Sequence, residues 1–378
     1  MKIVINAYSA RLGGGQTYLK NLLSRLPKGD DLAILVFAPA TLALPNEPRI
    51  RRISTRWPTT NPLSRAIWER FILPSFLRRE QADVLFCPGG VVGTTVPRGC
   101  KVVTMFRNMI PFDAQLVSRM PWGSQRFRNL LLRRVLLRSM KDANLTIFIS
   151  EHARSLIECF AKIPNPVTIP HGISEAFRPT GKSRARPLHA PEGRYLLYVS
   201  RFDIYKHHRE VVKAFHALPG ALKEDLFLVL IGESDMPEAL SVKQLISEYG
   251  LNEKILIMGA VPYEELPSWY AHSTAVLFAS SCENCPNILL EAMAAGRPVI
   301  SSDVMPMPEF GGDKLAYFSP FDPADITRAL IKLLGNSEYS EQLGNAALIR
   351  SQHYDWAKTA QETWAKIADL VNDGGSRK

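Results

Sequence analysis

The chain opens with MKIVINAYSARLGGGQTYLKNLLSRL, residues 1–26, and this stretch contains the repeating unit of the fold. The β-branched run from Ile3 to Ile5 predicts a strand, and Arg11 to Gly15 predicts a glycine-rich loop. After the loop, apolar residues recur at helical spacing: Tyr18, Leu19, Leu22, Leu23 and Leu26. Strand, loop and helix therefore follow one another within 26 residues.

The same rhythm continues through the first half of the chain. Apolar strands are predicted at residues 32–37, 84–87, 102–105 and 145–149, with a weaker one at 50–53. Longer helical stretches separate several of these strands. Continuous apolar strands that alternate with helices indicate a parallel sheet covered on both faces.

The second half restarts this rhythm after a linker. Residues 173–193 are interrupted by three prolines and show little apolar periodicity. Strands follow at 195–199, 226–231, 255–258, 275–279 and 299–301, and helices at 207–217, 236–249, 263–271, 287–295, 322–334 and 354–371. We predict an α/β protein with two Rossmann-like, doubly wound domains, residues 1–172 and 194–353, facing each other across a cleft.

Length and composition agree with two folded domains. One core rarely serves more than about 250 to 300 residues, and the chain has 378. An apolar fraction of 46% and a charged fraction of 22% exclude disordered and collagen-like classes. No apolar run is long enough to cross a bilayer, and the first residues lack a signal-peptide core, so we expect a cytoplasmic protein.

Five cysteines argue against disulfides and metal. Cys282 and Cys285 form one CxxC pair, but no second pair or histidine stands at zinc-site spacing. We expect reduced thiols, no bound metal and no cofactor.

The charge is distributed unequally between the two halves. Residues 1–189 carry 29 Lys and Arg against 11 Asp and Glu, a net +18, whereas the remainder carries a net −8. A basic half predicts an anionic partner, and the alternative is a solvated basic face without a partner. Arg126 to Lys141 is predicted to be helical, but its arginines leave no clean apolar stripe for a membrane-lying helix.

The most specific chemical signal is SCENCPNILLEAMAAGRPVI, residues 281–300. Glu283 precedes a helix that starts near Asn287, and Glu291 lies about one turn inside it. A helix N-terminus after a strand suits a diphosphate, and Glu291 is placed to accept hydrogen bonds from sugar hydroxyls. Taken alone, two glutamates at this spacing are equally consistent with one helix-capping and one surface carboxylate.

Two cations accompany these carboxylates. Arg201 follows a predicted strand, Lys206 comes five residues later, and both could converge on phosphate oxygens. Two fixed cations that clamp a leaving diphosphate would replace a divalent metal. Gly13 to Gly15 permit close backbone approach to a ligand, but they are not the GxGxxG fingerprint of a nicotinamide cofactor.

With these motifs the chain resembles a family 4 retaining glycosyltransferase of the GT-B fold over nearly its full length. The matching pieces are the GGG loop, ISE at 149–151, IPHGI at 169–173, Arg201 with Lys206, the E-x7-E motif from Glu283 to Glu291 with AMAAGRPVI, and YDWAKTA at 354–360. The E-x7-E block is highly specific, whereas the glycines and ISE are not.

The resemblance implies a role for each motif. The first domain would bind the acceptor and the second a nucleotide sugar, and the final helix, 355–372, would pack back on the first domain. Arg201 and Lys206 would hold the diphosphate, Glu291 the ribose and Glu283 the transferred sugar. Gly14, Gly15 and the backbone at Pro286, Asn287 and Ile288 would contribute to the donor site.

One motif departs from the family pattern. Many members carry a histidine after the strand that here ends near Met105, but this chain reads MFRNMIPFD at 105–113. Arg107 or Asn108 takes that place, and Asp113 is a further candidate for acceptor contact. Neither Arg107 nor Asn108 is a general base at neutral pH. The family resemblance favours a retaining mechanism that does not require one, in which the departing diphosphate takes the acceptor proton on the same face. The alternative is that Arg107 and Asn108 both stabilise the loop.

These observations rank the possible functions of the chain. The leading hypothesis is a retaining, metal-independent hexosyltransferase using GDP-mannose or a UDP-hexose, in surface polysaccharide or lipopolysaccharide assembly. A nucleotide-sugar epimerase of the same fold and a transferase with a soluble acceptor are the alternatives. A nucleic-acid binder is disfavoured, because the arginines lack aromatic interleaving.

The basic half also predicts where the enzyme works. We expect a lipid-linked glycan acceptor and reversible contact with the inner face of the cytoplasmic membrane. The arginines predicted to make that contact are Arg49, Arg51, Arg52, Arg78, Arg79, Arg133 and Arg134.

Overall fold

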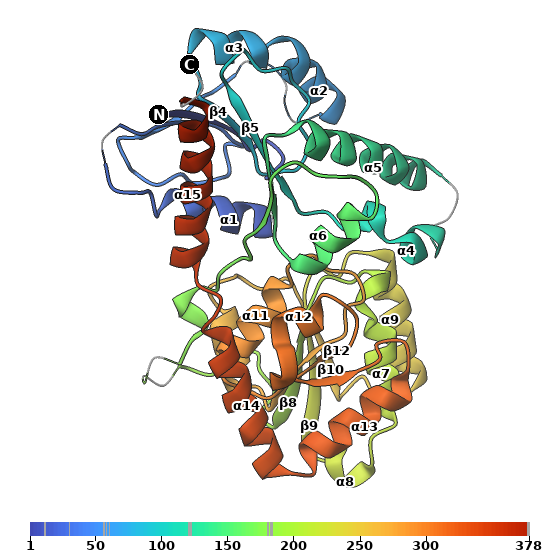
Figure 1. The fold of residues 1–378 in the computed structure, drawn as a ribbon. Coiled ribbons are helices and arrows are strands. Elements are labelled where there is room, and N and C mark those ends of the chain that lie inside the picture. The colour runs from blue at the N-terminus through green and yellow to red at the C-terminus, as the bar shows by residue number, and fades with distance from the viewer. Residues whose placement is uncertain are drawn as a thin grey trace. The chain divides into compact units, whose positions relative to one another are not determined.

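The computed structural model describes residues 1–10, 13–29, 31–55, 57, 59, 61–119, 123–179, 181 and 184–375. Two compact units make up the chain. Unit 1 contains Met1–Gly172 and Trp356–Lys378, and unit 2 contains Ile173–Asp355. Each unit is built on one parallel sheet with helices on both faces (Figure 1). Among the described residues, no helix is long and apolar enough to span a membrane.

The sheet of unit 1 has seven parallel strands in the order β3-β2-β1-β4-β5-β6-β7. The strands are β1 (Lys2–Asn6), β2 (Ala33–Phe37), β3 (Ile50–Arg52), β4 (Val84–Cys87), β5 (Lys101–Phe106), β6 (Leu145–Phe148) and β7 (Pro166–Thr168). β1 and β4 are neighbours at the centre, and the chain runs outward from them in opposite directions. This reversal of strand order is the topological switch point of a doubly wound sheet.

Helices cover the sheet of unit 1. They are α1 (Gly14–Leu23), α2 (Pro62–Phe71), α3 (Leu73–Arg79), α4 (Ala114–Arg119), α5 (Ser124–Asp142), α6 (Glu151–Glu158) and α15 (Trp356–Gly375), with the short 3-10 helix η1 (Ile110–Phe112). The last helix, α15, packs on α1, where the Trp364 indole Nε1 donates to the carbonyl oxygens of Leu22 and Arg25. Trp356 and Trp364 are both buried, so the two tryptophans anchor α15 in the core of this unit.

Unit 2 repeats the same topology with six parallel strands in the order β10-β9-β8-β11-β12-β13. The strands are β8 (Arg194–Val199), β9 (Leu226–Ile231), β10 (Ile255–Gly259), β11 (Ala275–Phe278), β12 (Val299–Ser302) and β13 (Ala316–Phe318). The switch point lies between β8 and β11. The predicted class, two doubly wound parallel-sheet domains, is confirmed by both sheets.

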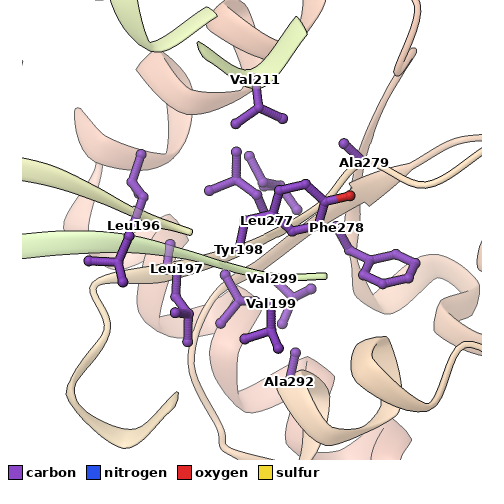
Figure 2. Close-up of a cluster of buried hydrophobic side chains, with 14 of the residues drawn as sticks. Leu196, Leu197, Tyr198, Val199, Val211, Leu277, Phe278, Ala279, Ala292 and Val299 are labelled. Carbon is purple, nitrogen blue, oxygen red and sulfur yellow. The ribbon is translucent and has the colours of Figure 1, made fainter. Parts of the chain in front are cut away.

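The helices of unit 2 enclose a single large core. They are α7 (His208–His216), α8 (Gly220–Lys223), α9 (Pro237–Glu248), α10 (Leu266–His272), α11 (Asn287–Ala294), α12 (Met307–Gly311), α13 (Pro323–Leu334) and α14 (Ser337–Ser351), with η2 (Glu175–Phe177), η3 (Ile204–Lys206) and η4 (Gly312–Lys314). Figure 2 shows the side chains of β8 and β11 packed between Val211 of α7 and Ala292 of α11. Residues Ile173–Asp355 belong to this unit, and Phe177 is buried in its core.

Candidate active site

The candidate site of unit 2 lies at the carboxyl ends of β8 and β11. Ligands of doubly wound sheets bind where strand order reverses, because the loops after the two central strands diverge there. Here those loops are residues 200–207 and 279–286. The Ser281 amide donates to the Tyr205 carbonyl at 2.9 Å, so a hydrogen bond joins the two loops. The fold thus brings together the predicted cations of one loop and the first predicted glutamate of the other.

Lys206 and Glu283 form the centre of this site. The Lys206 ammonium donates a hydrogen bond to the Glu283 carboxylate, and both side chains are largely buried. The ammonium also lies over two aromatic rings, 5.1 Å from the centroid of Tyr205 and 5.6 Å from that of Phe278. The Tyr198 hydroxyl donates to the Lys206 carbonyl at 2.6 Å and fixes the backbone. A buried ion pair at a switch point is thus held in place from both strands.

Arg201 is arranged differently from Lys206. Its Nε lies 2.9 Å from Asp203 Oδ2, and about half of its side chain is exposed. The two predicted phosphate ligands therefore contact different carboxylates, and only Lys206 is paired with Glu283. A half-exposed guanidinium can turn toward an incoming anion at low cost, because an ion pair that solvent reaches is worth little.

Gly232 positions the backbone of the Arg201 loop. Its φ is +154°, and a Cβ placed on it would overlap the carbonyl oxygen of Ser200. The Ser200 amide donates to the Ile231 carbonyl at 2.7 Å, and the Phe202 amide donates to the Glu233 carbonyl at 3.1 Å. The backbone of Gly232, directly after β9, thus lies against that of Ser200, directly after β8. Only glycine permits this approach, and the contact sets the direction in which the loop leaves β8.

Glu291 is buried on the second turn of α11. The Tyr263 hydroxyl donates to Glu291 Oε1 at 2.7 Å, while Oε2 is buried without a hydrogen-bond partner among the described residues. Burial raises the pKa of Glu291 to about 8, and the hydrogen bond from Tyr263 opposes that rise. One carboxylate oxygen is thus fixed and the other is left to accept a hydrogen bond.

Tyr263 is the residue that the sequence analysis missed. The helix predicted at 263–271 begins instead at Leu266, because Pro267 fits the first turn of a helix, and Tyr263 remains in the preceding turn. Its ring packs edge-on against Phe177, with centroids 5.4 Å apart. Nothing in the spacing to Glu291 indicates this contact, because the two residues meet only through the fold.

The predicted start of α11 is close to the observed one. The helix begins at Asn287, directly after Pro286, whose side chain makes no capping hydrogen bond. The Leu290 amide donates to the Pro286 carbonyl at 3.0 Å, and Ile288 is half-buried. Pro286, Asn287 and Ile288 therefore lie together at the positive end of the helix dipole, next to the loop that carries Glu283.

The two histidines beside Lys206 pack at the start of α7. His208 is stacked between two aromatic rings, with centroids 4.1 Å from Phe202 and 4.8 Å from Tyr198. Burial lowers the pKa of His208 to about 3, so the ring is neutral and unsuited to acid-base work at neutral pH. His207 Nε2 lies 2.8 Å from Ser281 Oγ and forms a second link between the two loops.

Two of the predicted residues of unit 1, Gly15 and Arg107, line a cavity at the switch point of that unit. A cavity of about 230 Å³ is lined by Ser9, Ala10, Gly15, Pro88, Gly89 and Arg107. Gly14 and Gly15 are the first residues of α1, and a Cβ on Gly15 would lie 3.4 Å from Arg107 Nη1. The Arg107 guanidinium carbon is 5.9 Å from the ring centroid of Tyr18. Of the two residues that could replace the family histidine, Arg107 is the one that lines this cavity.

Asn108 and Asp113 have local structural roles. Asn108 Oδ1 accepts a hydrogen bond from the Ile110 amide at 3.2 Å, and Asp113 Oδ1 accepts one from the Leu116 amide at 2.8 Å. Both side chains therefore stabilise the chain around η1 and the first turn of α4, as Asx residues commonly do.

Within the part of the chain that the structure describes, no three His, Cys, Asp or Glu side chains are grouped as metal ligands. None of the five cysteines, all of which are described, forms a disulfide, and Cys282 is buried beside Glu283.

Comparison with protein families covers most of the chain. The model for glycosyltransferase family 4 matches residues 12–177, and the model for glycosyl transferases group 1 matches residues 180–350. The first match covers most of the N-terminal part of unit 1, and the second contains Arg201, Lys206, Glu283 and Glu291.

Individual proteins resemble the chain at low identity. O-antigen chain mannosyltransferase B of Escherichia coli is 26% identical over 232 residues, which cover 60% of this chain and 60% of that protein. The match thus spans about three fifths of the relative's length.

Two solved structures share the fold along nearly the whole chain. Sucrose-phosphate synthase from Thermosynechococcus elongatus matches with a TM-score of 0.80 at 17% identity, covering 99% of this chain and 100% of that one. Anabaena HepE, solved in complex with UDP-glucose, matches with a TM-score of 0.73 at 15% identity, covering 98% and 100%. The chain belongs to the family 4 glycosyltransferases and has the GT-B fold.

Proposed function

We propose that the chain is a retaining, metal-independent hexosyltransferase. It moves a hexose from GDP-mannose or a UDP-hexose to a hydroxyl of a growing, lipid-linked glycan. The observation that carries this proposal is the buried Lys206–Glu283 pair at the switch point of unit 2. The name of the E. coli relative supports a mannose donor and a polysaccharide acceptor, and the UDP-glucose complex of HepE supports a nucleotide-sugar donor.

The donor would occupy the unit 2 site in an orientation set by the charges there. Its diphosphate oxygens bind the Lys206 ammonium and the exposed Arg201 guanidinium, near the N-terminus of α11. Glu283, released from Lys206, accepts hydrogen bonds from hydroxyls of the transferred hexose. The unpartnered Glu291 Oε2 accepts them from the ribose.

The transfer step needs no protein base. The bond between the anomeric carbon and the diphosphate oxygen breaks, and a bond from the acceptor oxygen to the same carbon forms on the same face. The acceptor proton passes to the departing diphosphate oxygen, whose negative charge Lys206 and Arg201 stabilise. His208, the histidine next to the site, is neutral and buried and cannot serve as the base. Its state is consistent with a route that uses no protein base.

Acceptor-dependent product formation tests this proposal. The protein, treated with chelator, is incubated with GDP-mannose or a UDP-hexose, with and without a lipid-linked glycan acceptor. We expect release of nucleoside diphosphate only with acceptor, and a product with the anomeric configuration of the donor. An inverted product contradicts retention, and an isomerised sugar formed without acceptor identifies an epimerase.

Tyr263→Phe tests the proposed role of Glu291. Without the Tyr263 hydroxyl, the pKa of Glu291 rises further above 8, so less of the carboxylate is ionised at neutral pH. We expect the KM for donor to rise several-fold at pH 7 with a small change in kcat, and the difference from wild type to shrink toward pH 9. Steady-state kinetics across this range measures both constants.

A matched substitution separates this effect from a general loss of structure. Tyr339→Phe removes a hydroxyl from a half-buried tyrosine on α14, far along the chain from the site, and should leave the pH profile unchanged. A KM for donor that shifts equally at every pH in Tyr263→Phe would contradict the role assigned to the hydrogen bond.

We also propose peripheral contact with an anionic membrane, where a lipid-linked acceptor resides. Three of the arginines predicted for that contact are engaged within unit 1. Arg49 and Arg52 donate to backbone carbonyls, and the Arg133 guanidinium lies 4.3 Å from the Phe160 ring centroid. Arg51, Arg78, Arg79 and Arg134 are exposed, and two of them, Arg51 and Arg79, form ion pairs with Glu80.

A further inference from the structure

Helix α2 of unit 1 has an inverted distribution of apolar and charged side chains. Leu63, Ile67 and Phe71 are 77%, 48% and 71% exposed, although a soluble protein normally turns such residues inward. They recur every four residues and therefore form one stripe along the helix. Ala66 and Arg70, also exposed, fall on the same face.

The inward face of α2 carries a carboxylate instead. Glu69 is only 7% exposed, and its Oε1 accepts a hydrogen bond from Asn6 Nδ2 at 2.8 Å. Arg65 forms an ion pair with it at 3.9 Å, and Trp68 is buried beside it in the core. The orientation of the helix is thus fixed by a buried polar contact, and the apolar stripe is left facing outward.

The exposed charges around the stripe are mainly cationic. Glu69 is the only Asp or Glu between Asn61 and Arg79, and it is buried. On the same stretch Arg70, Arg78 and Arg79 are exposed, the last two on the adjoining helix α3. Figure 1 shows α2 and α3 next to each other at the margin of unit 1. Glu80, which directly follows α3, forms an ion pair with Arg79 at 3.3 Å, but its side chain is only 18% exposed. The exposed surface is therefore mainly apolar and cationic, which complements an anionic lipid interface.

We propose that α2 lies in the surface of an anionic bilayer, with Leu63, Ile67 and Phe71 inserted among the lipids and Arg70 at the headgroups. This inference rests on the proposed membrane-linked function and identifies the surface that makes the contact. Because apolar insertion is insensitive to salt whereas attraction between exposed charges is screened, the two parts of the interaction can be measured separately.

Vesicle flotation of the full chain tests the proposal. The variants are Leu63→Gln/Phe71→Gln, Arg70→Gln/Arg78→Gln and, as a matched control, Leu240→Gln, which replaces a leucine 70% exposed on α9 of unit 2. Each is mixed with phosphatidylcholine vesicles or with vesicles containing phosphatidylglycerol, at low and high salt. Circular dichroism checks that each variant is folded.

Wild type and Leu240→Gln are expected to bind the anionic vesicles and to keep part of that binding at high salt. Loss of the two apolar side chains should weaken binding roughly tenfold at both salt concentrations. Loss of the two arginines should weaken it at low salt only. Equal binding by wild type and Leu63→Gln/Phe71→Gln, or no binding of wild type to anionic vesicles, would overturn the proposal.

Sugar transfer in detergent, measured on the same samples, separates this proposal from the proposed function. Vesicle binding by an inactive protein leaves the surface assignment standing and rejects the function. Activity without vesicle binding rejects the surface assignment alone, and a soluble acceptor then fits better.

Discussion

Glu283→Gln is expected to reduce kcat by about 100-fold or more while changing the KM for donor much less. Glutamine keeps the size of the side chain but removes the charge that pairs with Lys206, and it replaces one of the two oxygens proposed to accept from the hexose hydroxyls with an NH2 donor. Hydrogen bonds to the reacting sugar gain most in the transition state, so their loss falls mainly on kcat. Steady-state kinetics with saturating acceptor gives the two constants.

The control for this variant is Glu253→Gln, an exposed glutamate of the same unit. Its kinetics should match wild type within error. If Glu283→Gln turns over at close to the wild-type rate, Glu283 has no role in the reaction and is only a structural partner of Lys206.

Lys206→Ala should lower kcat/KM by roughly 100-fold or more, because it removes a fixed cation from the departing diphosphate and leaves the largely buried Glu283 unpaired. Lys206→Arg should not restore activity, since the ammonium lies close above the Tyr205 and Phe278 rings and a planar guanidinium needs a different space. Initial rates with and without chelator measure both effects.

Lys243→Ala, on the exposed face of α9, is the matched control and should be fully active. Chelator should leave the wild-type rate unchanged. A wild-type rate that falls in chelator and recovers with magnesium or manganese would contradict the role of the two cations as the diphosphate clamp.

The repeating core of each sheet could be predicted from sequence because its strands are continuous apolar runs. Residues 84–87 and 226–231 were predicted with the bounds that the structure shows for β4 and β9. The missed strands, β7 and β13, have three residues each and lie at sheet edges, where partial exposure weakens the apolar signal. Helix α14 was also missed, because Ile349 is exposed and its apolar residues do not lie on one face.

The site was less predictable than the fold. The positions of Lys206 and Glu283 followed from motifs, but their direct pairing did not, because the two residues are 77 positions apart and meet through the loops of neighbouring strands. The hydrogen bond between Tyr263 and Glu291 could not be predicted from the sequence either, because these residues also meet only through the fold. Local sequence reports helix caps and turns, whereas contacts between loops depend on how the sheet is wound.

Calorimetric titration of GDP and of UDP in the presence of chelator measures whether unit 2 holds a nucleotide diphosphate without a metal. We expect one of the two nucleotides to bind wild type and Lys243→Ala with a stoichiometry of one. Binding should be weaker in Glu291→Ala and lost in Lys206→Ala. Binding that requires a divalent cation, or that is equally strong in all four proteins, would contradict a metal-independent donor site built around the Lys206–Glu283 pair.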